Sequence, residues 1–345
     1  MHNVKLQYNL LVASYLEPEH VACIRQVDGR VNVIWEPDLL AQPRYAADHT
    51  GAPLQRTPEQ EARWRELLGQ ADILFDFDYS HRQDLPDLAP HVRWVQSTSA
   101  GIGQLVKSYG YDTRMPGTVF TTASGVHAKP LAEFCIMAML MFNKGLVHML
   151  DDQKRKHWER YAGTDLDGRT LGILGVGRVG SEVARRGKAF GMRVIGTNAG
   201  CSSAVLDRLY CPEELPEMLR EAEYFVICVP HTPSTAGLIG ARELALLPEG
   251  ALFINIGRGT VVDEPALIES LRSQHLRGAA LDVFADEPLP PGSPLWDMPN
   301  VLVSPHSAST SDRENGRITD LFCDNLGRFL AGEPLLNVLD TELMY

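Results

Sequence analysis

Cysteine is sparse in this sequence, and no cysteines are spaced for metal binding. The 345 residues include six of them and no Cys-x-x-Cys pair: Cys23, Cys135, Cys201, Cys211, Cys228 and Cys323. This pattern argues against a zinc site and a disulfide framework, and it suits a reducing compartment. We therefore expect a cytoplasmic protein that binds no metal.

Basic runs and long apolar stretches are also missing. The formal net charge is −12 and no segment is rich in lysine or arginine, so nucleic acid and anionic membranes are poor partners. The longest strongly apolar run, Phe134 to Phe142, is too short to span a bilayer. The N-terminal residues do not have the layout of a signal peptide. An anionic substrate would need a local positive site, because the overall charge is negative.

Strand and helix patterns alternate through the first third of the chain, which predicts a parallel sheet. We expect strands at residues 4–13, 31–35, 73–77, 92–97 and 119–122, and helices at 18–25 and 58–68. We interpret this part as a separate α/β domain of flavodoxin-like strand order.

Ligands of such sheets bind beyond the carboxyl ends of the strands, where two loops follow. One loop is Asp78 to His81; the other, Ser99-Ala100-Gly101, could present successive N–H groups to a carboxylate. Either could instead be a plain surface turn. Tyr79, His81 and the loop around Ile102 are expected to shape a substrate side-chain pocket.

The chain is organised around Thr170 to Asn198, which reads as strand, glycine turn, helix and strand. Gly175 permits a tight turn, Gly177 lets backbone N–H groups approach a pyrophosphate, and Gly180 allows close helix–strand packing. The helix N-terminus adds N–H donors and a partial positive charge. The motif predicts a dinucleotide site; the alternative is a glycine turn that only packs.

The second strand of this motif ends at Asn198, where an NAD site usually carries an acidic residue that bonds the ribose. No arginine or lysine follows at residues 199–203 to hold a 2′-phosphate. We expect NAD as cofactor, with NADP possible, because an uncharged pocket discriminates weakly between them.

The second half of the chain continues the alternation. Six strands counted from Leu171 make a doubly wound sheet, with four of them at residues 224–229, 251–256, 279–284 and 301–304. Helices are expected at about 213–220, 241–246 and 264–272.

Two further helices frame this second domain. Pro130 is well placed as the first residue of a long helix that reaches Trp158. The last helical segment, 311–330, has no strand left to pair with in the second sheet, so we place it on the first domain, which becomes discontinuous.

Three chemically active residues follow successive strands of the second domain. Arg258 can hold a keto-acid carboxylate in a two-pronged pair. His306 can donate a proton to the carbonyl during reduction and take it back during oxidation, and Glu287 can hold the imidazole and favour its charged form. Taken singly, each could be a surface turn, a solvated loop or a cap. Their coincidence after a dinucleotide motif favours an active site.

The chain resembles the D-isomer-specific 2-hydroxyacid dehydrogenase family over nearly its whole length, most densely from Ser124 to Ser309. The resemblance rests on the glycine motif and on six further motifs: Gly125-Val126-His127-Ala128, Leu131-Ala132-Glu133, Val229-Pro230-His231-Thr232-Pro233-Ser234-Thr235, Asn255-Ile256-Gly257-Arg258-Gly259, Leu281-Asp282-Val283-Phe284 and Ser304-Pro305-His306. The resemblance implies a catalytic trio of Arg258, Glu287 and His306.

The resemblance also implies the binding residues. Arg178 and Val179 would face the pyrophosphate, Val229 and Pro230 would flank the adenosine, Asp282 with the backbone near Ile256 and Gly257 would hold the nicotinamide, and Ser99, Ala100 and Gly101 would bind the substrate carboxylate. Family members are generally homodimers through their cofactor domains, which fits the apolar helix after Pro130. Glu287 stands where formate-oxidising relatives carry glutamine, and no additional C-terminal regulatory domain is expected.

The sequence thus predicts an α/β protein with two doubly wound parallel-sheet domains. A Rossmann dinucleotide-binding domain, 125–306, is inserted into a discontinuous flavodoxin-like substrate domain, 1–124 and 307–345. The expected reaction is hydride transfer between NAD(P) and a small 2-oxoacid or D-2-hydroxyacid of the glyoxylate or hydroxypyruvate type. One alternative is an NAD(H)-sensing scaffold or corepressor-like protein. Another is a reductase for a substrate without a carboxylate, which the Gly-Arg-Gly placement disfavours.

Overall fold

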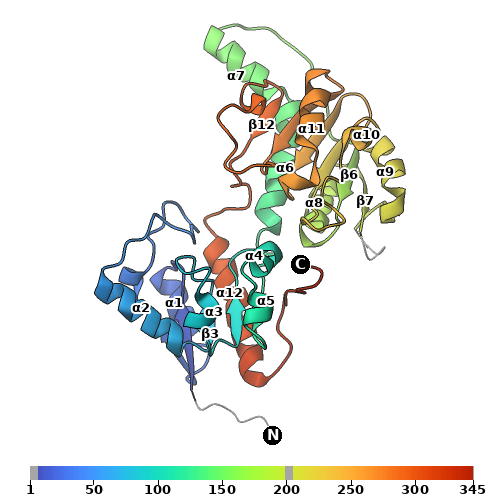
Figure 1. The fold of residues 1–345 in the computed structure, drawn as a ribbon. Coiled ribbons are helices and arrows are strands. Elements are labelled where there is room, and N and C mark those ends of the chain that lie inside the picture. Colours follow the sequence, from blue (N-terminus) through green and yellow to red (C-terminus); the bar gives the residue numbers. More distant parts are fainter. Residues whose placement is uncertain (1–6, 199–204, 345) are drawn as a thin grey trace. The chain divides into compact units, whose positions relative to one another are not determined.

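The computed structural model describes residues 7–198 and 205–344, which form two compact units (Figure 1). Unit 1 comprises Met1–His127 and Thr310–Tyr345, and unit 2 comprises Ala128–Ser309. The sequence placed these two boundaries after residues 124 and 306. Residues 199–203, where no basic residue follows Asn198, lie outside the described residues.

Unit 1 is built on a five-stranded parallel sheet in the order β2-β1-β3-β4-β5. The predicted flavodoxin-like order is therefore confirmed. The strands are β1 Tyr8–Val12, β2 Val31–Ile34, β3 Ile73–Phe75, β4 Trp94–Gln96 and β5 Val119–Thr121. The helices are α1 Pro18–Arg25, η1 Pro37–Leu39, α2 Pro58–Gln70, α3 Leu85–Leu88, α4 Gly103–Ser108, α5 Tyr111–Arg114 and α12 Glu314–Ala331.

The core of unit 1 has two halves, one on each face of the sheet. Successive side chains of a strand point to opposite faces, so Leu10 enters the half that contains Phe322 of α12, and Leu11 enters the half that contains Trp64 of α2. Phe322 stacks on Trp94 of β4 with ring centroids 4.9 Å apart. The C-terminal helix thus covers one face of the sheet formed by the N-terminal part of the chain.

Unit 2 contains a seven-stranded parallel sheet in the order β12-β11-β10-β9-β6-β7-β8. The strands are β6 Thr170–Leu174, β7 Arg193–Thr197, β8 Arg208–Tyr210, β9 Tyr224–Ile227, β10 Ala251–Asn255, β11 Leu276–Leu281 and β12 Val301–Val303. The prediction of six strands was wrong because it omitted β8. This edge strand has three residues, too few to show a period of two, and only its pairing with β7 defines it.

Helices cover both faces of the second sheet (Figure 1). They are α6 Ala128–Asn143, α7 Leu146–Arg155, α8 Arg178–Ala189, η2 Pro212–Glu214, α9 Leu215–Glu221, α10 Ala241–Leu244, η3 Gly259–Val261, α11 Glu264–Arg272 and η4 Pro294–Trp296. The strand order reverses between β6 and β9, and in doubly wound sheets such a switch point is where ligands bind.

The long helix predicted from Pro130 to Trp158 is wrong in its continuity. The chain forms α6 and α7, with a 56° bend between them. Gly145 lies between them with a φ of 66°, a left-handed conformation that interrupts the helical hydrogen bonds. Over the described residues, no single helix is long and apolar enough to cross a membrane, although α6 and α7 together, as a bent pair, reach that length and apolar composition.

Candidate active site

The glycine motif forms the turn from β6 into α8. Gly175 has a φ of 95°, and a Cβ atom there would lie 2.6 Å from Val229 Cγ1. A Cβ atom at Gly180 would lie 2.3 Å from the Gly175 carbonyl oxygen, so this position of α8 packs directly against the turn. Both positions require glycine for the reasons that the sequence suggested.

Gly177, the residue before α8, has different surroundings. Among the described residues, a Cβ atom there would meet nothing within 4 Å, and no side-chain hydrogen bond caps the helix at this residue. Arg178 and Val179 are the first two residues of α8. Any larger side chain at residue 177 would occupy this open space. It fits a phosphate group of a dinucleotide, which helix N-termini attract.

The ends of three neighbouring strands meet beside this turn. Val229 follows β9, and a Cβ atom on Gly257 after β10 would lie 2.6 Å from the Val229 carbonyl oxygen. Pro230 follows Val229, and Ile256 precedes Gly257. Asn198 directly follows β7, the strand on the other side of β6. The structure therefore places the predicted cofactor-binding segments along one edge of the sheet.

Asp282 follows β11 and is buried, with 1% of its surface exposed. Its Oδ1 atom accepts hydrogen bonds from Ser304 Oγ at 2.6 Å and from the amides of Ser307 and Ala308, both at 2.9 Å. Burial raises the pKa of the Asp282 carboxyl, and these hydrogen bonds act in the opposite direction. Asp282 thus bonds to the Ser304 side chain before His306 and to the backbone of the two residues after it.

Glu287 and His306 form a direct pair. The distance from His306 Nδ1 to Glu287 Oε2 is 2.8 Å, and Glu287 Oε1 accepts a hydrogen bond from the Phe284 amide at 3.0 Å. Burial works to raise the pKa of Glu287, but hydrogen bonds from His306 and Phe284 prevail and hold that pKa below its ordinary value. The His306 side chain is 45% exposed, so its ring remains accessible.

Arg258 lies in the turn after β10. Its Nη1 donates to the Gly257 carbonyl at 2.7 Å, and Asn255 Nδ2 donates to the Arg258 carbonyl at 3.1 Å. Burial lowers the pKa of Arg258, whereas the charges of Glu287 and Asp282 act to raise it. A Cβ atom on Gly259 would lie 1.9 Å from the Phe284 backbone, so the loop that leads to Glu287 packs against the Arg258 turn.

Two residues of this arrangement received no role from the sequence. Asn255 orders the turn by accepting from the Gly257 amide at 3.0 Å as well as by donating to Arg258. Ser304 is bonded to Asp282. The sequence did contain a signal for both residues. Asn255 is a polar residue at the end of the apolar strand ALFIN, and Ser304 is a polar residue just beyond the apolar strand VLV.

The predicted substrate residues Ser99, Ala100 and Gly101 belong to unit 1, where they follow β4 and are exposed. The Ser99 amide donates to Ser97 Oγ at 3.0 Å, and the Ser99 carbonyl accepts from the Ala123 amide at 2.9 Å. Within the described residues, the amides of Ala100 and Gly101 have no acceptor. Two of the three predicted amides are therefore open to a ligand.

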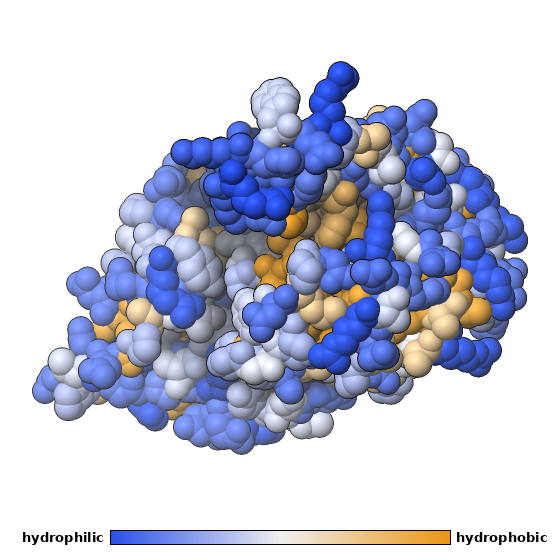
Figure 2. Space-filling model, turned by 90° about the horizontal axis from the view of Figure 1, so that it is seen from above, coloured by the Kyte–Doolittle hydropathy of each residue, from blue (hydrophilic) through white to orange (hydrophobic). Residues whose placement is uncertain are grey.

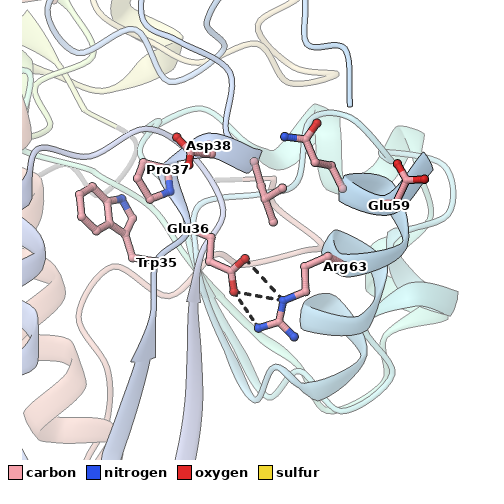
Figure 3. A pocket seen from close by; sticks show the side chains of 8 residues that line it. Trp35, Glu36, Pro37, Asp38, Glu59 and Arg63 are labelled. Carbon is pink, nitrogen blue, oxygen red and sulfur yellow. Dashed lines mark hydrogen bonds and ion pairs between the residues drawn. The ribbon is translucent and has the colours of Figure 1, made fainter. Parts of the chain in front are cut away.

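A cavity of about 510 Å³ in unit 1 lies at the end of β2, next to α2. Figure 3 shows the Glu36 carboxylate directed at the Arg63 guanidinium, with Nη2 and Oε1 2.7 Å apart. Asp38 and Glu59 add further acidic groups to its lining. None of the predicted site residues lines this cavity, and its acidic lining does not suit an anionic substrate.

Comparison with known proteins identifies the family. Residues 136–308 match the family model described as D-isomer specific 2-hydroxyacid dehydrogenase, NAD binding domain. A glyoxylate reductase of Aeropyrum pernix is 35% identical over 271 residues, covering 76% of this chain and 80% of that protein.

Solved structures agree. A D-isomer specific 2-hydroxyacid dehydrogenase family protein from Aeromonas salmonicida superposes with a TM-score of 0.80 at 28% identity, covering 97% of this chain and 99% of that one. An NADPH-dependent glyoxylate/hydroxypyruvate reductase from Sinorhizobium meliloti, solved with NADP and sulfate, gives a TM-score of 0.75 at 27% identity and covers 98% of this chain and 100% of that one. The chain therefore belongs to the D-isomer specific 2-hydroxyacid dehydrogenase family and is an NAD(P)-dependent oxidoreductase of small 2-oxoacids.

Proposed function

We propose that His306 is the proton donor and acceptor of this reaction and that Glu287 holds it in place. The observation that carries the proposal is the 2.8 Å contact between His306 Nδ1 and Glu287 Oε2. With Nδ1 engaged, Nε2 is the nitrogen that gives a proton to the carbonyl oxygen in reduction and takes it back in oxidation. The carboxylate stabilises the imidazolium that reduction requires.

Arg258 is proposed to bind the substrate carboxylate and orient its carbonyl. A guanidinium presents parallel N–H groups that match two carboxylate oxygens. In unit 1, the Ala100 and Gly101 amides, with Ser99 shaping the loop, are proposed as hydrogen-bond donors to the substrate carboxylate. Fixing the carboxylate fixes the neighbouring carbon, which is where hydride adds or leaves.

The cofactor is proposed to lie along the strand ends of unit 2. Gly175, Gly177, Arg178, Val179 and Gly180 would receive the pyrophosphate, Asn198 the adenosine ribose, Val229 and Pro230 the adenosine, and Ile256, Gly257 and Asp282 the nicotinamide. When bound, the nicotinamide supplies or accepts the hydride. The open space at Gly177, directly before the start of α8, supports this placement.

The substrates that we propose are glyoxylate and hydroxypyruvate, since the relatives with those names match most of the chain. A spectrophotometric screen of small 2-oxoacids with NADH and NADPH in parallel tests this. We expect oxidation of reduced cofactor that depends on the 2-oxoacid. Tight cofactor binding without turnover of any 2-oxoacid would instead support the sensing scaffold.

We also propose that the protein is a cytoplasmic homodimer. Apolar residues reach the surface among hydrophilic ones on the face in Figure 2. The α6–α7 surface is defined here by five exposed side chains, Met137, Leu146, Val147, Met149 and Leu150, each 39–48% exposed. Neighbouring apolar residues on exposed helices mark association surfaces, and a second copy would cover them. The net charge of −12 argues against nucleic acid as a partner.

A further inference from the structure

The loops after β3 and β4 of unit 1 are joined by one buried carboxylate. Asp76 is fully buried, and its Oδ2 accepts a hydrogen bond from Thr98 Oγ1 at 2.9 Å. Its Oδ1 accepts one from the Tyr79 hydroxyl at 3.3 Å. Thr98 directly precedes Ser99, Ala100 and Gly101. The Tyr79 ring is therefore fixed beside the loop that we propose to bind the substrate carboxylate.

Arg82 lies over this ring. Its guanidinium carbon is 5.0 Å from the centroid of Tyr79, and its Nε atom is buried without a hydrogen-bond partner. In the part of the chain that the structure describes, no carboxylate forms a salt bridge with Arg82. Among the described residues, the cation thus stacks on the face of an aromatic ring and has no salt-bridge partner.

Its cationic neighbours are paired. His81 contacts Asp78 and Glu61 at 2.7 Å each, and Arg56 Nη1 lies 3.4 Å from a Glu61 oxygen. Removing a polar group from water without a partner costs free energy, and the cost is larger for a charged group. The Arg82 guanidinium is held on a ring, has no salt-bridge partner among the described residues, and lies beyond the carboxyl end of a parallel sheet. It is therefore suited to bind an anion.

We propose that Arg82 binds a second anionic group, a carboxylate or a phosphate, at the far end of a 2-oxoacid whose own carboxylate is held by the Ala100 and Gly101 amides. This inference rests on the proposed function and adds a preferred class of substrate to glyoxylate and hydroxypyruvate: 2-oxoacids that carry a second anionic group, called dianionic here for their two anionic groups. The planar guanidinium suits both anions because each offers two oxygens to its N–H fork. Asp76 acts as a positioning residue by holding Tyr79 and Thr98.

The test compares kcat/KM for glyoxylate with kcat/KM for oxaloacetate, 2-oxoglutarate and 3-phosphohydroxypyruvate. We expect the wild type to prefer at least one of these dianionic substrates over glyoxylate by about tenfold or more. Arg82→Gln should remove most of that preference, and Arg82→Lys should keep part of it because the charge remains. Using the ratio of the two substrates cancels any loss of folded enzyme.

Arg93→Gln is the matched control. Arg93 lies 5.7 Å from the Tyr8 ring and 5.5 Å from the Phe329 ring, and it directly precedes β4. Like Arg82, it stacks on an aromatic ring of unit 1. It lies at the amino-terminal end of the strands, however, whereas Arg82 lies beyond their carboxyl end. This variant removes the same charge and should leave the substrate ratio unchanged.

Three outcomes would overturn the inference. A wild type without preference for any dianionic 2-oxoacid would reject it while leaving the proposed function standing. If the Arg82→Gln variant loses activity on glyoxylate and on dianionic substrates equally, Arg82 only packs against Tyr79 and does not bind the second anionic group. Absence of turnover with every 2-oxoacid, with cofactor still bound, would reject the proposed function and this inference with it.

Discussion

The hydrogen bonds that one carboxylate oxygen of Asp282 accepts give this residue a structural role. The family resemblance suggested that Asp282 holds the nicotinamide, whereas the structure shows its Oδ1 bonded to Ser304 and to the amides after His306. Both roles are compatible, because those three bonds all end on Oδ1. A buried carboxylate that fixes a loop backbone reduces the freedom of the imidazole attached to that loop.

Replacing Glu287 with Gln tests the proton-transfer pair. Hydrogen bonds from His306 and Phe284 hold the pKa of Glu287 below its ordinary value despite burial, so the carboxylate is ionised throughout the assay range. Its charge favours the protonated imidazole that reduction needs. We expect kcat/KM for reduction in Glu287→Gln to decline at a lower pH, on the basic side of the profile, than in the wild type.

Glu264→Gln is the control for this experiment. Glu264 Oε2 accepts a hydrogen bond from the Ala285 amide at 3.0 Å, so it contacts the same loop without contacting His306. Its pH profile should match the wild type. If kcat/KM for reduction in Glu287→Gln declines at the same basic pH as in the wild type, Glu287 has no role in holding the proton on His306.

Replacing Asn198 with Asp tests how the protein discriminates between NAD and NADP. A carboxylate at the end of β7 would accept hydrogen bonds from both ribose hydroxyls and would repel a 2′-phosphate. We expect Asn198→Asp to raise the ratio of kcat/KM for NADH to kcat/KM for NADPH by roughly tenfold, since a hydrogen bond to a charged group contributes about 1.5–3 kcal/mol. Steady-state assays with both cofactors measure this. An unchanged ratio would place the adenosine ribose elsewhere.

The loop between β3 and α3 contains a charge cluster that depends on pH. The imidazole of His81 lies between Asp78 and Glu61, with 2.7 Å to each carboxylate. The hydrogen bond to Asp78 is the largest cause that raises the pKa of His81 above its ordinary value of 6.5. The pKa values of Asp78 and Glu61 are lowered, because their hydrogen bonds outweigh the effect of burial.

The stabilisation by this cluster should have a defined pH window. A raised histidine pKa stabilises the fold fully below the unfolded value of about 6.5, and the effect is lost as pH rises through the higher folded value. The lowered carboxyl pKa values contribute above about 4 and are lost as pH falls through their folded values. We therefore expect His81→Gln to lower the urea midpoint most near pH 5 and least near pH 9.

The control for His81→Gln is His157→Gln. His157 contacts Glu159 at 3.1 Å beyond the end of α7, with 51% of its side chain exposed, so solvent screens the pair. Its effect on the urea midpoint should be small at every pH. A His81→Gln effect that is equal at pH 5 and pH 9 would show that the ring only packs in this loop.

Most of the two sheets could be predicted from the sequence, and the failures have identifiable causes. Alternating strand and helix patterns dictate a parallel sheet, so Arg258, Glu287 and His306 could be placed at strand ends without coordinates. The bend at Gly145 was missed because the apolar pattern continues from α6 into α7. The partners of Asp282 and the unpaired state of Arg82 depend on distances across the fold, which no local pattern contains.

The oligomeric state is the prediction that concerns the whole molecule. Leu150 is 47% exposed on the α6–α7 surface, and burying it in a dimer would contribute about 25 cal/mol for each Å² removed from water. A glutamate there would be buried in the dimer interface without a partner for its charge. We expect Leu150→Glu to shift the protein from dimer to monomer in light scattering. Tyr45→Glu changes an apolar residue of unit 1 that is 54% exposed and should leave the mass unchanged. A wild type that is already monomeric, or a Leu150→Glu variant that remains dimeric, would place the interface elsewhere or remove it.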